Sequence, residues 1–144
     1  MLSTVNDNAS DGMPRGDEHR LLVLPATELF QERNWTVEPW AAAGGHKADF
    51  SATSPSGKRI VVEAKNFRKD EADVDFWTLL GQVVVNTDGS NQDYAILIPS
   101  AGLPWFKRHL GQHARNLLKL RILVVDSDRL LEADANLDLT PFAF

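Results

Sequence analysis

Polar and apolar residues alternate on both sides of the short segment Pro55-Ser56-Gly57, and this feature constrains the fold most. Proline favours the first central position of a type I turn, and glycine suits the left-handed residue that follows such a turn. Alternation with a period of two is typical of a strand that is buried on one face. The segment therefore predicts a β-hairpin with strands at residues 47–53 and 59–66.

Counting outward from the turn predicts which residues face each other across the hairpin. Phe50 pairs with Val62, and Asp49 pairs with Glu63. Because side chains alternate along a strand, one face is then apolar and the other is polar apart from Val61. A shift of one residue on either strand would mix the two faces, which favours this register. The apolar face consists of Phe50, Ala52, Ile60, Val62 and Ala64, and the polar face consists of Asp49, Ser51, Thr53, Arg59, Val61, Glu63 and Lys65.

The polar face carries two carboxylates, those of Asp49 and Glu63, whose Cβ atoms are expected to lie about 4.5–5.5 Å apart. Repulsion between neighbouring carboxylates is relieved by protonation or by a cation, and hard oxygen ligands suit Mg²⁺, with Mn²⁺ as a substitute. Lys65 follows on the same face, where its ammonium can orient a metal-bound water and balance charge on a phosphate. The three side chains predict a site that hydrolyses phosphodiesters. The simpler interpretation is an exposed hairpin with an ordinary surface pair of Glu63 and Lys65.

These residues resemble the motif of the PD-(D/E)xK nuclease superfamily, which includes Holliday-junction resolvases and Mrr-type restriction enzymes. Asp49 is followed fourteen residues later by Glu63-Ala64-Lys65 on an apolar strand, and Ala48 stands where the motif has proline. The resemblance covers residues 19–126. It implies a restriction-endonuclease-like αβββαβ core, with a mixed sheet flanked by helices, and a Mg²⁺-dependent endodeoxyribonuclease activity.

The resemblance also implies assisting roles for two residues outside the hairpin. Glu28, on the first expected helix, corresponds to an additional acidic ligand of the metal or the water. Gln82, on the helix after the lysine strand, corresponds to a glutamine near the active site. Each is also explained as an ordinary polar residue on the solvated face of its helix.

The rest of the chain alternates between helical and strand patterns, which predicts an α/β sandwich with a mixed sheet. A tail at residues 1–18 is expected to be disordered, and residues 19–144 are expected to form one domain. The tryptophans are expected in the core rather than as platforms for base stacking. We expect helices at 19–34 (interrupted near Pro25), 73–86 and 104–120 and further strands at 35–40, 94–98 and 122–126, whereas 41–45 is expected to be a loop and the last eighteen residues show no clear pattern.

The net charge of −5 conceals two basic segments. Residues 47–69 carry six Lys or Arg against two acids, and residues 99–121 carry five and no acid, whereas residues 70–98 carry six acids and no base. A phosphate backbone responds to such local charge, although chance segregation of solvated charges explains it too. The residues expected to contact DNA are Lys47, Lys58, Arg59, Arg68, Lys69, Arg108, Arg115 and Lys119, and the last three fall on one line of the expected helix at 104–120.

The chain contains no cysteine, which excludes disulfides, thiol catalysis and cysteine-ligated metal sites. His109 and His113 are four residues apart, but no third zinc ligand is evident. No apolar run approaches the roughly 18 residues that span a bilayer, and the N-terminus lacks the pattern of a secretory signal. We therefore expect a soluble cytoplasmic protein.

A chain of this length is short for recognising DNA alone, so a homodimer or a component of a larger complex is expected. Two alternatives stay open, because a fold does not determine a substrate. One is a nuclease that acts on RNA or on single strands. The other is a catalytically idle nuclease fold that serves as a binding or assembly module. Substrate structure, sequence preference and pathway have no signal in the sequence.

Overall fold

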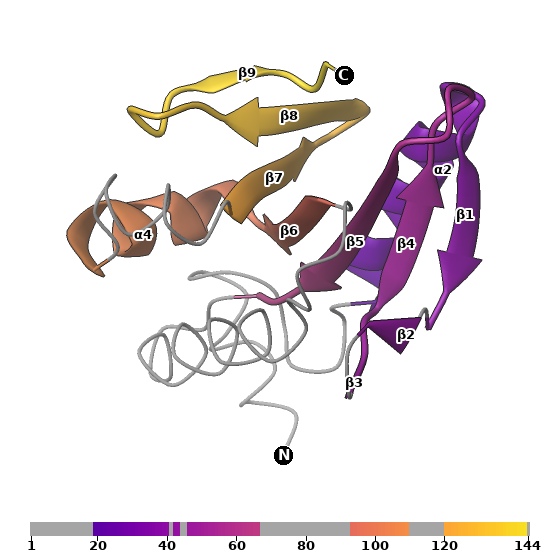
Figure 1. Cartoon of the computed structure of the whole chain (residues 1–144). Coiled ribbons are helices and arrows are strands. Elements are labelled where there is room, and N and C mark those ends of the chain that lie inside the picture. Colours follow the sequence, from indigo (N-terminus) through magenta and orange to yellow (C-terminus); the bar gives the residue numbers. More distant parts are fainter. Residues whose placement is uncertain (1–18, 41, 44–45, 67–92, 110–119, 144) are drawn as a thin grey trace.

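The computed structural model describes residues 19–40, 42–43, 46–66, 93–109 and 120–143. The expected tail at 1–18 and the expected helix at 73–86 lie outside these residues. Seven described strands form one mixed sheet in the order β1-β4-β5-β6-β7-β8-β9 (Figure 1). Their bounds are Thr36–Pro39 (β1), Phe50–Thr53 (β4), Arg59–Ala64 (β5), Asp93–Ile98 (β6), Leu120–Asp126 (β7), Arg129–Ala133 (β8) and Leu139–Pro141 (β9).

The type of strand pairing changes twice across the sheet. β1, β4 and β5 are antiparallel neighbours, whereas β5, β6 and β7 run parallel. β8 and β9 then return antiparallel, at the edge opposite β1. The prediction of an α/β fold with a mixed sheet is confirmed at this level.

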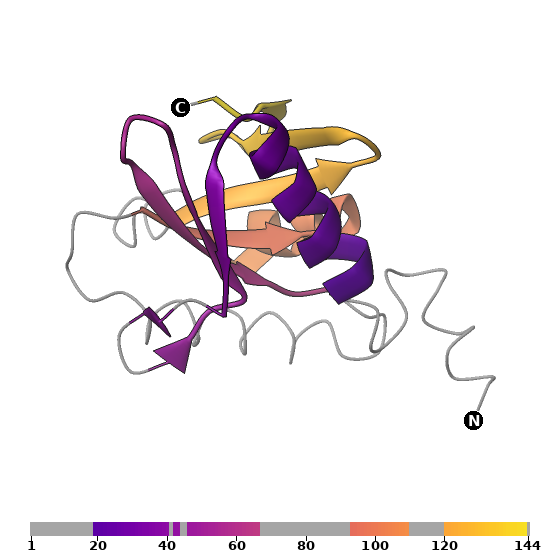
Figure 2. The ribbon, with the colours of Figure 1, turned by 90° about the vertical axis from the view of Figure 1, so that its right-hand side faces the viewer.

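One helical segment packs on the sheet (Figure 2). It starts with a π-helical turn, His19–Val23, and continues as α2, Leu24–Glu32, with Pro25 in its first turn. Proline is tolerated there because the first N–H groups of a helix have no partner within the helix. The predicted break near Pro25 is thus found as a change of helix type. Among the helices that the structure describes, none combines the length and the apolar character that a bilayer crossing requires.

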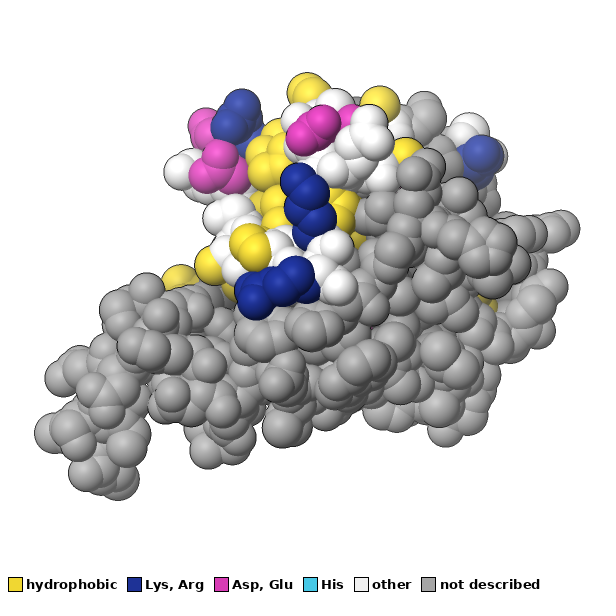
Figure 3. All heavy atoms as spheres, turned by 90° about the vertical axis from the view of Figure 1, so that its left-hand side faces the viewer, with side chains coloured by type: hydrophobic (Ala, Val, Ile, Leu, Met, Phe, Trp, Pro, Cys, Tyr) yellow, Lys and Arg dark blue, Asp and Glu magenta, His cyan; other side chains and the backbone are white. Residues whose placement is uncertain are grey.

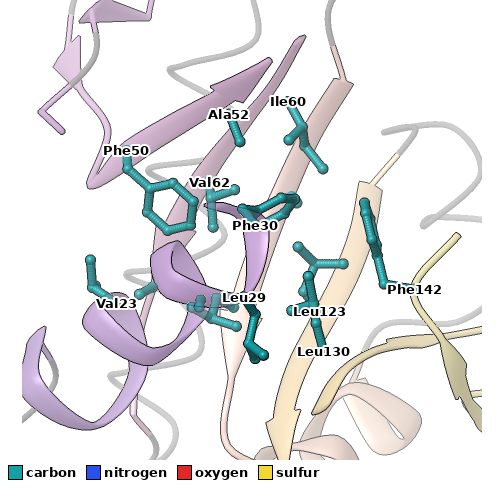
Figure 4. Close-up of a cluster of buried hydrophobic side chains, with 14 of the residues drawn as sticks. Val23, Leu29, Phe30, Phe50, Ala52, Ile60, Val62, Leu123, Leu130 and Phe142 are labelled. Carbon is teal, nitrogen blue, oxygen red and sulfur yellow. The ribbon is translucent and has the colours of Figure 1, made fainter. Parts of the chain in front are cut away.

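The core lies between this helical segment and one face of the sheet (Figure 4). Phe30 of α2 is fully buried, and its ring centroid lies 5.1 Å from that of Trp35, 6.0 Å from that of Phe50 and 5.3 Å from that of Phe142. Such tilted and edge-to-face aromatic contacts add to the free energy gained by burial. The aromatic residues therefore join the N-terminal helix, the hairpin and the end of the chain.

The register of the β4–β5 hairpin is the predicted one from Phe50 to Thr53, but the predicted strand pair of Asp49 with Glu63 is not formed, because β4 begins at Phe50. Phe50 pairs with Val62 and Ala52 with Ile60. The turn closes with a hydrogen bond from Ser54 N–H to the Lys58 carbonyl oxygen. Gly57 has a positive φ, which explains why glycine occupies this position of the turn. The predicted apolar face belongs to the core cluster beneath α2.

The segment before β4 differs from the prediction. The expected strand at 47–53 is divided, because β3 (His46–Lys47) pairs with β2 (Ala42–Ala43) in a separate two-stranded sheet, and β4 begins at Phe50. The expected loop at 41–45 therefore contains a short strand. The chain bends at Asp49, so pairing with β5 does not continue into β3.

The C-terminal part also corrects the prediction. A 3₁₀ turn, Ser100–Gly102, leads into α4, Leu103–His109. Leu120 is not the end of that helix, because it pairs with Tyr94 as the first residue of β7. The last eighteen residues contain β8 and β9, joined to their neighbours by antiparallel pairing.

Candidate functional site

Asp49 is anchored to the end of β5. The backbone N–H of Ala64 donates a hydrogen bond of 2.7 Å to Asp49 Oδ2. Continuing the hairpin register would place Ala48 opposite Ala64, but the pairing of β4 with β5 ends at Phe50 and Val62, and the Asp49 carboxylate takes this N–H. Ala64 is only 2% exposed, and hydrogen bonds to charged acceptors are stronger than neutral ones. The bond thus fixes the Asp49 carboxylate beside the backbone between Glu63 and Lys65.

Glu63 lies on the sheet face opposite α2. Its neighbour two residues earlier, Val61, belongs to a second buried cluster with Ala48 and Tyr94, apart from the core beneath α2. Residues two apart on a strand share a face, so Glu63 shares the face of Val61 as predicted. Glu63 is buried, at 7% exposure, which contradicts the interpretation as an ordinary solvated surface pair.

Lys65 follows directly after β5 and is partly buried. Its backbone N–H donates a 3.0 Å hydrogen bond to the carbonyl oxygen of Leu97 in β6. The lysine backbone is therefore held by the parallel neighbour of β5, while that of Ala64 is held by Asp49. Asp49 is thus bonded to the strand end that carries Glu63 and precedes Lys65, the carboxyl end of β5.

The two assisting residues are not joined to this group in the described structure. Glu28 is exposed on α2, which covers the other face of the sheet. Within the described ranges, no three His, Asp or Glu side chains gather as a group that could hold a metal ion. Gln82 lies outside the described residues.

The residues expected to contact DNA are spread over several elements. Lys58 is exposed, and Arg59 is half-buried with an ion pair of 3.7 Å to Glu38. Both lie at the turn end of the hairpin. Because a strand rises about 3.3 Å per residue, this end is roughly 15 Å along the strand from Asp49. Lys47 belongs to β3 and Arg108 is exposed on α4. The predicted contacts Arg68, Lys69, Arg115 and Lys119 lie outside the described residues.

Charge of both signs is visible on the described part of one face (Figure 3). Lys and Arg side chains there lie near Asp and Glu side chains, with hydrophobic atoms between them. This part of the surface is therefore mixed rather than uniformly basic.

Trp40 corrects the expectation that the tryptophans belong to the core. Trp35 is buried, at 7% exposure, but Trp40 is 60% exposed. Trp77 lies outside the described residues, as does the side chain of Trp105. Trp40 follows β1 with a positive φ of 53° and donates its backbone N–H to the carbonyl oxygen of Asp49 at 3.0 Å.

The donor chemistry of the group fits Mg²⁺ or Mn²⁺. Asp49 and Glu63 offer hard carboxylate oxygens, and Mg²⁺ in phosphate-processing sites is commonly held by one or two carboxylates, waters and the substrate phosphate. The two carboxylates of Asp49 and Glu63 therefore match the number of carboxylate ligands that such a Mg²⁺ site uses.

No family model matches the chain, and comparisons with curated proteins and with solved structures found no match. Membership of the PD-(D/E)xK superfamily stays a prediction, which rests on the residues themselves.

Proposed function

We propose that this protein is a Mg²⁺-dependent endodeoxyribonuclease of the PD-(D/E)xK type, with a restriction-endonuclease-like core. The observation that carries the proposal is the hydrogen bond from Ala64 N–H to Asp49. It brings an aspartate, fourteen residues distant in sequence from Glu63, to the strand end that also carries Glu63 and Lys65. Two carboxylates and a lysine carried at one strand end suit hydrolysis of a phosphodiester.

Each residue of the group has a distinct proposed role. Asp49 and Glu63 would hold Mg²⁺, which supplies a Lewis acid and a more acidic bound water. The burial of Glu63 lowers the local dielectric, which strengthens its attraction to a cation. Lys65 orients the attacking water and balances negative charge on the phosphate. Gln82 keeps the assisting role that the resemblance implies, whereas Glu28, exposed on α2, is not joined to the group.

The site itself can be tested by nicking of supercoiled plasmid DNA. Asp49→Asn, Glu63→Gln and Lys65→Ala should each lower the Mg²⁺-dependent rate by about 100-fold or more, as loss of a charge-stabilising group typically does. Matched controls are Asp128→Asn, Glu32→Gln and Lys107→Ala, which change exposed residues of the same types. The controls should cut at the wild-type rate.

Two results would contradict the proposal. Wild-type protein that cuts no DNA with Mg²⁺ or Mn²⁺ would leave a binding or assembly module as the explanation. A Lys65→Ala variant that cuts at the wild-type rate would remove lysine from the mechanism.

The proposed partner is DNA, and the proposed assembly is a homodimer or a larger complex. Two copies of one active site would place a cut on each strand of a duplex. Sedimentation of the protein with and without duplex DNA in Ca²⁺ tests this, and a single copy per duplex would oppose it.

A further inference from the structure

Trp40 combines two features that packing does not explain. Its side chain is largely exposed, and its backbone adopts a left-handed conformation that bulky residues rarely adopt. Glycine or asparagine would suit this φ better. Strained residues of this kind tend to occur at binding and catalytic sites. The side chain therefore merits a functional explanation.

A small cavity of about 210 Å³ lies where Trp40 meets the helical segment. Drug-sized ligands occupy pockets of about 300–1,000 Å³, so this cavity suits one planar ring system. Its walls are mostly apolar, and Leu24 on its rim is 45% exposed. Besides Trp40, the lining includes Leu24, Val37, Pro39, Thr27, Gln31 and Asp49.

Polar groups in the lining can read the edge of a ring. Thr27 Oγ1 donates to the carbonyl oxygen of Leu24 at 2.8 Å, so toward a ligand it can only accept. Gln31 is exposed and offers both a donor and an acceptor. An aromatic platform with such groups is the arrangement that recognises unstacked bases.

We propose that this cavity binds an unpaired nucleobase, and that the preferred substrate carries an unpaired nucleotide beside the phosphodiester to be cut. The inference rests on the proposed function and names its substrate class. Asp49 lines the cavity and is also the anchored carboxylate of the candidate site. The helical part of the lining lies on the α2 side of the sheet, opposite Glu63, so a base held here belongs to a nucleotide that reaches the site at Asp49, where β4 begins. A base inside a duplex is stacked on both faces and cannot reach Trp40.

Binding is tested with the full chain in Ca²⁺. The probes are two DNA duplexes that contain the fluorescent base 2-aminopurine, either in a one-nucleotide bulge or fully paired. Wild-type protein should bind the bulged duplex at least about tenfold more tightly and quench its fluorescence, because stacking on an aromatic side chain has an effect of this size. Trp40→Ala should weaken binding of the bulged duplex by about 10- to 100-fold.

Three further variants separate stacking from folding. Trp40→Phe should keep most of the preference, because phenylalanine also stacks. Trp40→Gly should lose the preference without a lower melting temperature, because glycine tolerates the positive φ. Leu139→Ala removes another exposed hydrophobic side chain, on the edge strand farthest from β1, and should bind as wild type does.

Cleavage of the same duplexes in Mg²⁺ distinguishes the two proposals. If wild type and Trp40→Ala cut with the same preference and quench equally, the base-binding inference is wrong and the proposed nuclease stands. If wild type binds the bulge through Trp40 but cuts neither duplex, the nuclease proposal fails and base binding is supported. If Trp40→Ala changes only self-association, the cavity binds a second copy of the chain and the inference is overturned.

Discussion

Asp49 has a structural role beside its proposed catalytic one, because its carboxylate accepts the N–H of the buried Ala64. Asp49→Ala should lower the free energy of unfolding by about 1–3 kcal/mol, the cost of leaving such a group unsatisfied. Asp49→Asn keeps an accepting oxygen and should cost less. Urea denaturation of both variants measures the difference, and Asp128→Ala is the control on an exposed aspartate. Equal stability of the Ala and Asn variants would show that this bond contributes nothing.

The sequence predicted the sheet face of the hairpin residues better than their burial. The alternation around the turn placed Glu63 on the face of Val61, and the structure confirms that face. Burial of Glu63 and exposure of Trp40 were not predicted, because both depend on elements that are distant in sequence. The aromatic character of Trp40 favoured the core, but its position after the last residue of β1 leaves it exposed.

At the scale of elements, local signals succeeded where pairing is local. The β4–β5 register follows from the turn residues and from an apolar face that one helix covers. By contrast, β8 contains Leu130 and Leu131 beside Glu132, a composition equally compatible with a helix. It becomes a strand through its pairing with β7 across a two-residue turn, in which Ser127 has a positive φ. The two-residue strands β2 and β3 are too short to show any periodicity.

Arg121 of β7 joins three strands and the chain end. Its guanidinium donates to both carboxylate oxygens of Glu132 in β8, at 2.8 and 2.7 Å, and to Asp93 in β6 at 3.0 Å. It also lies 5.1 Å from the centroid of the Phe142 ring, which packs on Phe30. The planar fork of arginine matches this geometry and lysine does not. The cluster therefore fastens the C-terminal strands to the parallel part of the sheet.

We predict that Arg121→Ala lowers the free energy of unfolding by about 2–3 kcal/mol, because it leaves the half-buried Glu132 without its arginine. Arg121→Lys should recover only part of this loss. The control is Arg129→Ala, which breaks an exposed pair with Asp126 of 2.8 Å and should cost less than about 0.5 kcal/mol. Thermal unfolding of the three variants is the measurement, and an Arg121→Ala variant no less stable than the control would contradict the prediction.

The neighbouring carboxylates of Glu132 and Asp93 favour the protonated, charged form of Arg121. Burial alone lowers the pKa of Arg121, but the hydrogen bonds and charges of Glu132, and then of Asp93, raise it, and the net direction is upward. A cationic group with a raised pKa contributes its full stabilisation at every pH below its ordinary pKa. Deprotonation of Arg121 therefore does not weaken the cluster near neutral pH.

For the molecule as a whole, the candidate site lies where antiparallel and parallel parts of the sheet meet. β5 pairs antiparallel with β4 and parallel with β6, and the site is at the carboxyl end of β5. Ligands of open α/β sheets commonly bind outside the carboxyl ends of parallel strands. The position is thus consistent with a binding site on general grounds, independent of the superfamily resemblance.

Metal binding should therefore stabilise the whole fold. A ligand that binds only the native state at ten times its dissociation constant adds about 1.4 kcal/mol. Titration with Mg²⁺ or Ca²⁺ should raise the melting temperature of wild type and of Glu32→Gln, but not of Glu63→Gln. Excess EDTA should abolish cleavage, and Ca²⁺ should support DNA binding without turnover. An identical rise in Glu63→Gln would place the metal elsewhere.

The last prediction concerns the proposed binding of DNA by a protein with a net negative charge. The net charge is −5, so affinity must come from local basic surface, and it should fall as salt concentration rises. Replacing Arg108, Arg115 and Lys119 with alanine should lower the slope of log affinity against log salt. The decrease is up to about 0.9 for each phosphate of duplex DNA that the variant no longer neutralises.

The matched comparison replaces Lys58 and Arg59 at the hairpin turn. Arg59 already pairs with Glu38, so its charge is partly compensated and this variant should change the slope less. Arg108 is exposed on α4, and its loss should change the melting temperature little. If the triple variant keeps the wild-type slope and the hairpin variant does not, the proposed DNA follows the hairpin. The active site would then be approached along β5 rather than from the helix.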